Sequence, residues 1–147
     1  RLNGTTDVKW ESQPVVIDGV KIANNIMELY PDLIYYDYTA WPYAKRPNET
    51  LPINYHLTFS RKENNDDQIA ENIYHGRNVT VVVDIPSRDK STAIPITWRE
   101  IPTFDADRSD FRPNDPIGRI LILRYKSAKA SSLADAIASG FVVPAFQ

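Results

Sequence analysis

The sequence contains no cysteine, and this absence removes disulfide bonds, thiolate nucleophiles and thiolate metal sites from consideration. Two histidines are also too few to suggest a metal centre, so we expect neither a metal nor a cofactor. The formal net charge of −2 provides no basic footprint, which argues against nucleic acid as a partner. No apolar run approaches the ~18 residues that a membrane-spanning helix needs.

The remaining composition is that of a globular protein. Hydrophobic residues make up 42% of the chain and charged residues 24%, which excludes the low-hydrophobicity composition of disordered chains. A chain of 147 residues has the size of one domain. We therefore expect residues 1–147 to form a single domain.

Several segments have strand patterns. Residues 53–60 alternate strictly between apolar and polar side chains, which is typical of a half-buried strand. The nearly continuous β-branched run at 79–85 predicts a central strand, and residues 118–125 predict another. Residues 93–99 predict a strand at a sheet edge, because a proline interrupts them. The many prolines and acids of residues 102–116 predict a long loop.

Helical patterns separate these strands. The spacing of apolar residues predicts a helix over 20–30 that Pro31 ends. A short helix is predicted between Asp66 and Gly76, and a final helix is predicted to close at Gly140. The order favours an α+β fold, with an antiparallel β-sheet and helices packed on one face.

The candidate chemistry lies around the strand at 53–60. A Ser-His-Asp site needs a nucleophile, a base within ~3 Å of it and a carboxylate that orients the base. His56 and Ser60 share the polar face of this strand, and Asp67 follows a turn that can fold back toward it. Four residues of strand separate His56 from Ser60 by roughly 13 Å, so they meet only if the strand bends. The alternative is that His56 is an ordinary solvent-facing strand residue.

Aromatic side chains mark a second candidate region. Tyr38, Trp41 and Tyr43 lie in a proline-stiffened segment, residues 32–52. Tyrosine and tryptophan suit surfaces that are partly apolar and partly wet, so these rings are candidates for partner binding. The alternative is that they cover the core.

The sequence also contains three N-glycosylation motifs, which argue weakly for secretion. They are Asn3-Gly4-Thr5, Asn48-Glu49-Thr50 and Asn78-Val79-Thr80. A glycan on Asn48 would favour a secreted protein.

Short segments of the chain resemble a viral family. Leu57-Thr58-Phe59, Asp67-Gln68-Ile69-Ala70 and the C-terminal Val143-Pro144-Ala145-Phe146-Gln147 resemble the protruding (P) domain of iflavirus capsid proteins, which belong to insect picorna-like viruses. The run Ile101-Pro102-Thr103-Phe104-Asp105-Ala106 also looks familiar there, with a different spacing.

The resemblance implies a C-terminal domain of a larger capsid protein that protrudes from the virion surface. It implies contacts with other capsid proteins and with a host-cell receptor or glycan. It also implies an Asp-His-Ser site of lipase, esterase or protease type, in which Asp67 takes the place of the family's aspartate. The family's adjacent His-Ser step falls in residues 35–55, which contain neither residue type, so only His56 and Ser60 lie near. A chain that ends at Gln147 suits release from a polyprotein that is cut after glutamine.

Our first hypothesis from the sequence is therefore a capsid surface domain for host-cell attachment or entry. The hydrolase-like site would consist of Asp67, His56 and Ser60, and the binding residues would be Trp41, Tyr43 and Tyr38. Two alternatives stay open. One is a secreted carbohydrate- or ligand-binding α+β domain, and the other is a small α+β enzyme with a carboxylate-lined pocket.

Overall fold

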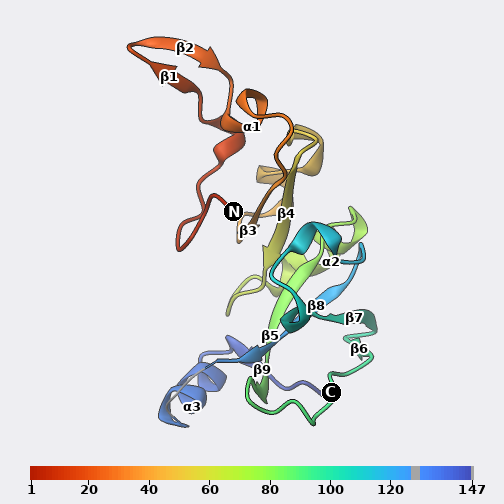
Figure 1. Ribbon diagram of the computed structural model, residues 1–147. Helices are drawn as coiled ribbons and strands as arrows, with labels where there is room; N and C mark the ends of the chain where they lie inside the picture. Colours follow the sequence, from red (N-terminus) through yellow and green to blue (C-terminus); the bar gives the residue numbers. More distant parts are fainter. Residues whose placement is uncertain (127–129, 147) are drawn as a thin grey trace.

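A mostly parallel β-sheet forms the body of the protein in the computed structural model, which describes residues 1–126 and 130–146 (Figure 1). The strand order is β3-β4-β5-β8-β7-β6, and β9 pairs with β5. The strands are β3 (Tyr35–Thr39), β4 (Tyr55–Ser60), β5 (Val79–Pro86), β6 (Thr97–Trp98), β7 (Ile101–Asp105), β8 (Ile120–Tyr125) and β9 (Val142–Val143). Gln147, where polyprotein cleavage was expected, lies outside the described residues.

The expected antiparallel sheet is wrong in strand direction. The pairings β3–β4, β4–β5, β5–β8, β7–β8 and β5–β9 are all parallel, and only the edge pair β6–β7 is antiparallel within this sheet. The physical reason lies in the connections, since a helical crossover after β4 brings the chain back to begin β5 in the same direction. The fold is therefore mixed α/β.

The helices are short. The α-helices are α1 (Ile26–Leu29), α2 (Ile69–Tyr74) and α3 (Ala130–Ala138). The 3-10 helices are η1 (Trp10–Ser12), η2 (Tyr43–Lys45), η3 (Asn48–Thr50), η4 (Asp66–Gln68), η5 (Ala106–Arg108) and η6 (Arg112–Asn114). Within the described ranges, no helix has the length and apolar character to cross a membrane.

The predicted helix over 20–30 is wrong in its first half. Residues 15–23 instead form a hairpin of β1 (Val15–Ile17) and β2 (Val20–Ala23), which projects from the body (Figure 1). Asp18 and Gly19 both have positive φ, at 49° and 79°, as a two-residue hairpin turn requires. The helical pattern is realised only in α1, where the side chain of Asn25 accepts a hydrogen bond from the Glu28 amide (2.9 Å).

The sheet has two different faces. Apolar side chains of β4, β5 and β8 face α2, and the core there includes Phe59, Val81, Ile122 and Ile69. The opposite face is rich in hydroxyl groups, and we call it the hydroxyl face. It is formed by Tyr36, Tyr38, His56, Thr58, Ser60, Thr80, Val82, Leu121 and Leu123, which the strand register places side by side. The alternation predicted for residues 53–60 is confirmed over β4 in the direction of the side chains, although Thr58 on the polar face is also buried. Ile53 precedes the strand and is 98% exposed.

Other strand predictions hold in part. Residues 79–86 form the central strand β5, and the predicted edge strand at 93–99 is reduced to β6. The predicted loop over 102–116 is wrong at its start, because residues 101–105 form β7 and pair with β8. Later in that segment, next to η6, the ring of Phe111 meets Tyr36 of the hydroxyl face edge-on at 5.4 Å.

The N-terminal segment is fastened to the sheet by buried polar groups. Asp37 on β3 accepts hydrogen bonds from the amides of Leu2 (3.1 Å) and Asn3 (2.7 Å) and from the Tyr55 hydroxyl (2.6 Å). Because Asp37 and Asn3 are almost completely buried, these bonds fix the position of the segment. The N-terminal residues therefore form a wall beside the ends of β3 and β4.

Candidate ligand-binding site

A hollow of about 380 Å³ opens at the carboxyl ends of β3 and β4, and we call it the carboxyl-end hollow. Its lining includes hydroxyl groups of Tyr38, Ser60 and Thr80, together with the apolar side chains of Leu123 and Phe141. The N-terminal segment supplies the opposite wall. The volume lies within the range of small-molecule sites, and the carboxyl ends of parallel strands are where open α/β sheets bind ligands.

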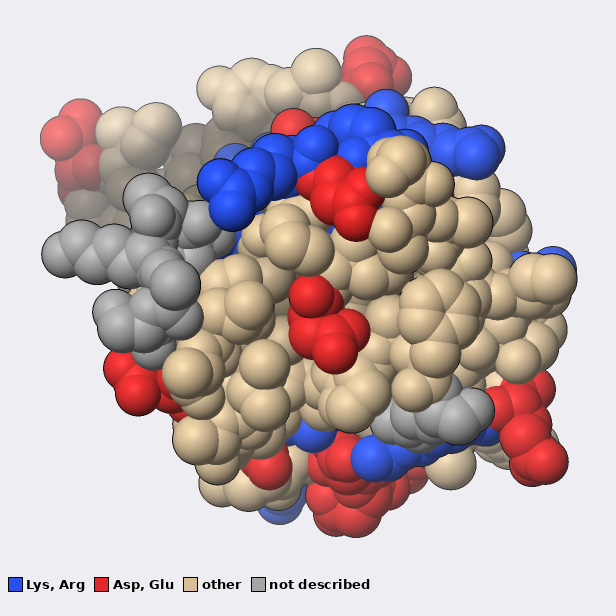
Figure 2. Space-filling view, turned by 90° about the horizontal axis from the view of Figure 1, so that it is seen from below, with Lys and Arg blue, Asp and Glu red and all other residues tan. Residues whose placement is uncertain are grey.

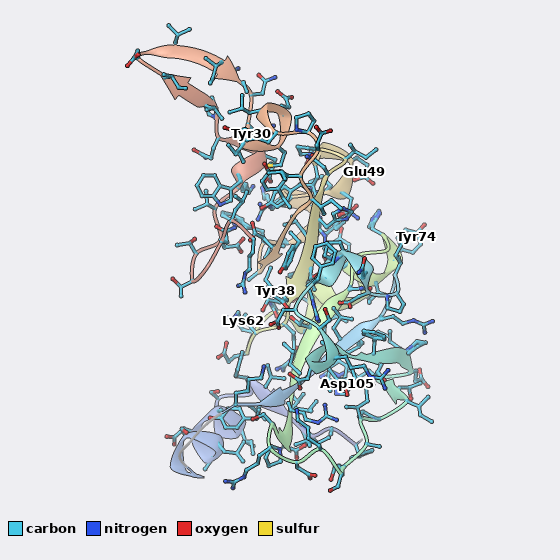
Figure 3. All side chains as sticks on the ribbon, in the orientation of Figure 1. Tyr30, Tyr38, Glu49, Lys62, Tyr74 and Asp105 are labelled. Atoms are coloured by element: carbon cyan, nitrogen blue, oxygen red, sulfur yellow. The ribbon has the colours of Figure 1, made fainter. Side chains whose placement is uncertain are left out.

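Two basic side chains at this hollow have no acidic partner in the described part of the chain. The guanidinium of Arg1 lies 4.9 Å from the centre of the Tyr38 ring, and the Lys62 ammonium lies 5.4 Å from the centre of the Phe141 ring. Figure 3 shows Tyr38 and Lys62 close to each other near the ends of β3 and β4, and both residues line the hollow. The carboxylate of Asp7 also lines it.

The other charges of the hollow are already neutralised. Asp7 forms an ion pair with Arg46 (3.0 Å). Arg61 donates to Asp66 (2.7 Å) and to the carbonyl of Gly140 (2.6 Å). The charge that remains available to a ligand is therefore positive and comes from the two side chains at the rim. The Tyr38 hydroxyl stays protonated, because burial raises its pKa more than nearby arginines lower it.

On the face that Figure 2 shows, basic charge is gathered in one part. Figure 2 looks from below, at the end of the molecule opposite the projecting hairpin, and shows Lys and Arg side chains in a band across one part of this face. Acidic side chains lie against the band, and most of the remaining surface is uncharged. On this face, the acidic side chains beside the band interrupt the basic surface that an extended polyanion would need.

A second hollow of about 360 Å³ lies at the other end of the hydroxyl face, and we call it the amino-end hollow. Its lining includes His56 and Thr58 from β4 and the buried side chains of Arg112 and Asp115 from the segment that contains η6. Burial lowers the pKa of His56 and raises the pKa of Asp115, which Arg112 partly opposes. The two hollows share no lining residue.

The predicted catalytic residues lie in different places. His56 lines the amino-end hollow and Ser60 lines the carboxyl-end hollow, at opposite ends of the straight strand β4. Asp67 lines neither hollow; it is exposed on η4 and accepts a hydrogen bond from Gln68 (2.9 Å). The structure brings none of the three into a shared hollow, and the hydrolase hypothesis stays a prediction.

The three predicted binding aromatics also differ in their surroundings. Trp41 is 41% exposed, and Tyr38 is half-buried in the carboxyl-end hollow. Tyr43 is buried instead. Its ring stacks on His75 at 4.1 Å, and the Arg77 guanidinium lies 4.7 Å from its centre. The exposure of Trp41 is compatible with the prediction that it binds a partner. The buried position of Tyr43 instead fits the alternative that these rings cover the core.

The asparagines of the three glycosylation motifs are structural residues. Asn3 is 1% exposed. The Asn48 side-chain oxygen accepts two hydrogen bonds from Arg77, at 3.1 and 2.7 Å. The Asn78 side chain donates to the carbonyl of Pro116 at 2.8 Å. Because each side chain takes part in internal hydrogen bonds or is buried, the folded protein offers none of them freely to a glycan.

Sequence reasoning missed Arg112 and Asp115, which line the amino-end hollow. No sequence signal pointed to them, since charged residues in a proline-rich segment are normally exposed. Their burial follows from the packing of this segment on the hydroxyl face. In the residues that the structure describes, no group of three or more His, Cys, Asp or Glu could hold a metal ion.

Comparison with known proteins identifies a family but no activity. No curated protein matches the chain, and no solved structure does. The family described as Gene product 88 matches residues 1–144, which is nearly the whole sequence. That description states no activity and does not bear on the likeness to capsid protruding domains. The chain belongs to the Gene product 88 family.

Proposed function

We propose that this protein is a small-molecule-binding domain and that it binds an organic anion in the carboxyl-end hollow. The observation that carries the proposal is a pair of basic side chains, Arg1 and Lys62, at a hollow where parallel strands end; neither has an acidic partner among the residues that the structure describes. The ends of adjacent parallel strands are a preferred ligand site in open α/β sheets.

The lining specifies the chemical class of the ligand. The hydroxyl groups of Ser60 and Tyr38 can donate hydrogen bonds to ligand oxygens, whereas the Thr80 hydroxyl already donates to the carbonyl of Phe59 at 3.2 Å. Leu123 and Phe141 offer apolar surface to the body of the ligand. A carboxylate or phosphomonoester with a small apolar body therefore fits better than a bare inorganic ion.

The test is ligand-induced thermal stabilisation. Citrate, hexanoate and adenosine monophosphate serve as anionic probes, and hexanol and adenosine serve as neutral counterparts. A probe at ~100 times its Kd adds ~2.7 kcal/mol of stability and raises Tm by several degrees. Lys62→Gln should abolish most of this shift, whereas Lys21→Gln on the hairpin should not. Equal shifts with charged and neutral probes, or no shift with any probe, would refute the proposal.

A virion-surface attachment domain is the second candidate, and the projecting hairpin supports it. Val16, Ile17, Val20 and Ile22 are 45–62% exposed on this hairpin. Exposed apolar side chains on a projecting element suit contact with another protein, such as another capsid protein. The test is the gene itself: a coat-protein jelly roll encoded immediately upstream supports this candidate, and a free-standing reading frame opposes it.

A hydrolytic site of Asp67, His56 and Ser60 belongs to this second candidate. Ester hydrolysis by the purified chain should then fall at least ~100-fold in Ser60→Ala and His56→Ala. No activity in the wild type, or wild-type activity in both variants, removes the site.

A further inference from the structure

The turn between β6 and β7 has a strained backbone. Its two central residues, Arg99 and Glu100, have positive φ angles of 47° and 64°. The turn between β1 and β2 also has positive φ at both positions, but there the residues are Asp18 and Gly19, a pair that such turns favour. A residue with a Cβ is sterically disfavoured in the left-handed region. The β6–β7 turn therefore holds two unfavourable residues, and their side chains are the place to look for a compensating role.

The side chain of Arg99 makes two contacts outside the turn backbone. Its guanidinium lies 4.4 Å from the centre of the Trp98 ring, and Trp98 is 1% exposed. Its Nη2 lies 2.8 Å from Oδ2 of Asp66 on η4. The buried ring and the carboxylate thus give the arginine one direction, although 44% of its side chain is exposed. Asparagine at this position would satisfy the turn but could not make the ion pair.

Asp66 connects this turn to the carboxyl-end hollow. Its other oxygen, Oδ1, accepts a hydrogen bond from Nε of Arg61 at 2.7 Å. Arg61 is 5% exposed, lines the hollow, and donates from Nη1 to the carbonyls of Gly140 (2.6 Å) and Phe141 (2.9 Å). One carboxylate therefore holds two arginines, of which Arg61 lines the hollow and Arg99 does not.

The wall that Arg61 holds lies between two short elements. Phe141 follows α3, which lies at the periphery of the body, and precedes β9, a strand of two residues (Figure 1). Hydrogen bonds from a guanidinium to carbonyls are charge-assisted and stronger than neutral ones, so the Arg61 guanidinium is a main fastening of this wall. The Lys62 ammonium lies 5.4 Å from the centre of the Phe141 ring, so the ring also orients a basic group of the hollow.

We propose that Arg99 is a positioning residue of the carboxyl-end hollow. It orients Asp66 and, through Asp66, the guanidinium of Arg61. Arg61 in turn fixes the Phe141 ring and the Lys62 ammonium beside it. The inference rests on the proposed function, since it takes this hollow as the ligand site. The strain at the turn is then the consequence of placing an arginine where ligand binding needs it.

Relief of the strain separates this role from a purely structural one. Arg99→Asn combined with Glu100→Gly gives the turn its favoured residues, so Tm of the ligand-free protein should rise by ~2–8 °C. The same double variant removes the ion pair with Asp66, so affinity for the anion that binds best among adenosine monophosphate, citrate and hexanoate should fall about fivefold in calorimetric titration. Glu100→Gly alone is the matched control, because it relieves strain and keeps Arg99. Its Tm should rise while its affinity stays at the wild-type value.

Amide NMR spectra of the ligand-free chain test the path of contacts directly. Arg99→Gln and Asp66→Ala should both shift the amides of Gly140 and Phe141, because both substitutions interrupt the path to Arg61. Arg99→Lys keeps the charge and should shift them less. Glu100→Gly should leave them at their wild-type positions.

The outcomes keep this inference apart from the proposed function. Lower affinity in a double variant of raised Tm, with shifted Gly140 and Phe141 amides in Arg99→Gln, supports the inference. Wild-type affinity in the double variant, a fall of its Tm together with its affinity, or amide shifts that end at Asp66 overturn it and leave the anion proposal standing. If none of the anions binds the wild type, the proposed function fails, and the amide shifts alone decide whether Arg99 positions this wall.

Discussion

Replacing Arg46 with methionine should remove the main ionic fastening of the N-terminal segment. Arg46 is 1% exposed, and its guanidinium donates to Glu11 (2.7 and 2.8 Å), Asp7 (3.0 Å), the Val8 carbonyl (3.1 Å) and the Tyr55 hydroxyl (3.0 Å). Methionine preserves much of the volume but leaves the carboxylate of Glu11, which is 6% exposed, without a counter-charge.

The magnitude follows from that burial. Breaking a buried ion pair by removing one partner costs ~3–5 kcal/mol, because the other charge stays buried and uncompensated. Asp7 is 30% exposed and can be partly rehydrated, so we expect a loss of ~4 kcal/mol. Such a loss is a large fraction of the ~5–15 kcal/mol that a domain of this kind possesses.

Urea unfolding followed by circular dichroism measures the loss. Lys45→Met is the matched control. Lys45 directly precedes Arg46 and its side chain is exposed, so this substitution should change the free energy of unfolding by less than ~0.5 kcal/mol. Tyr55→Phe should cost ~1–3 kcal/mol, and its effect should not add to that of Arg46→Met because the two groups are hydrogen-bonded. A loss below ~1 kcal/mol for Arg46→Met would refute the reasoning.

Other predictions concern single positions. Burial alone would raise the pKa of Asp66, but hydrogen bonds from Arg61 and Arg99 hold it below its usual value. The ionised Asp66 carboxylate therefore stabilises the folded protein at neutral pH, by less than ~1 kcal/mol after solvent screening, and this contribution is lost as pH falls below ~4. Urea unfolding curves of Asp66→Asn and the wild type should converge below that pH. Gly76→Ala should cost ~1–2 kcal/mol in urea unfolding, since Gly76 has a φ of 75°. Mass spectrometry of the folded chain secreted from glycosylating cells should find no glycan on the three asparagine motifs, because their side chains are used internally.

Strand positions were largely predictable from local patterns. The alternation at 55–60 and the β-branched run at 79–85 marked β4 and β5, because side chains on a strand alternate between faces whatever lies beside it. Strand direction was not predictable in the same way, because a buried strand carries the same pattern beside a parallel or an antiparallel neighbour. In hindsight the unbroken apolar run of β5 is typical of a parallel strand covered on both faces.

The failed helix over 20–30 shows two local signals in competition. Helical spacing of Ile22, Ile26 and Leu29 predicted a helix, whereas Asp18-Gly19 is a strong hairpin signal when apolar residues flank it. The turn decided the structure of residues 15–23, and only α1 kept the helical pattern. Giving the Asp-Gly pair more weight would have predicted the hairpin.

The sequence by itself determined which segments become strands, which side of β4 is polar and that the chain forms a globular domain without disulfides. Only the tertiary structure decided where the buried charges meet: Arg46 contacts Glu11 from 35 positions away, and the segment that carries Arg112 packs against Tyr36 of β3. Local patterns report the few neighbouring residues that set a turn or a strand. Pairing of buried charges depends on which distant segments the sheet brings together, because a charge enters the interior only where a partner from another segment offsets its desolvation.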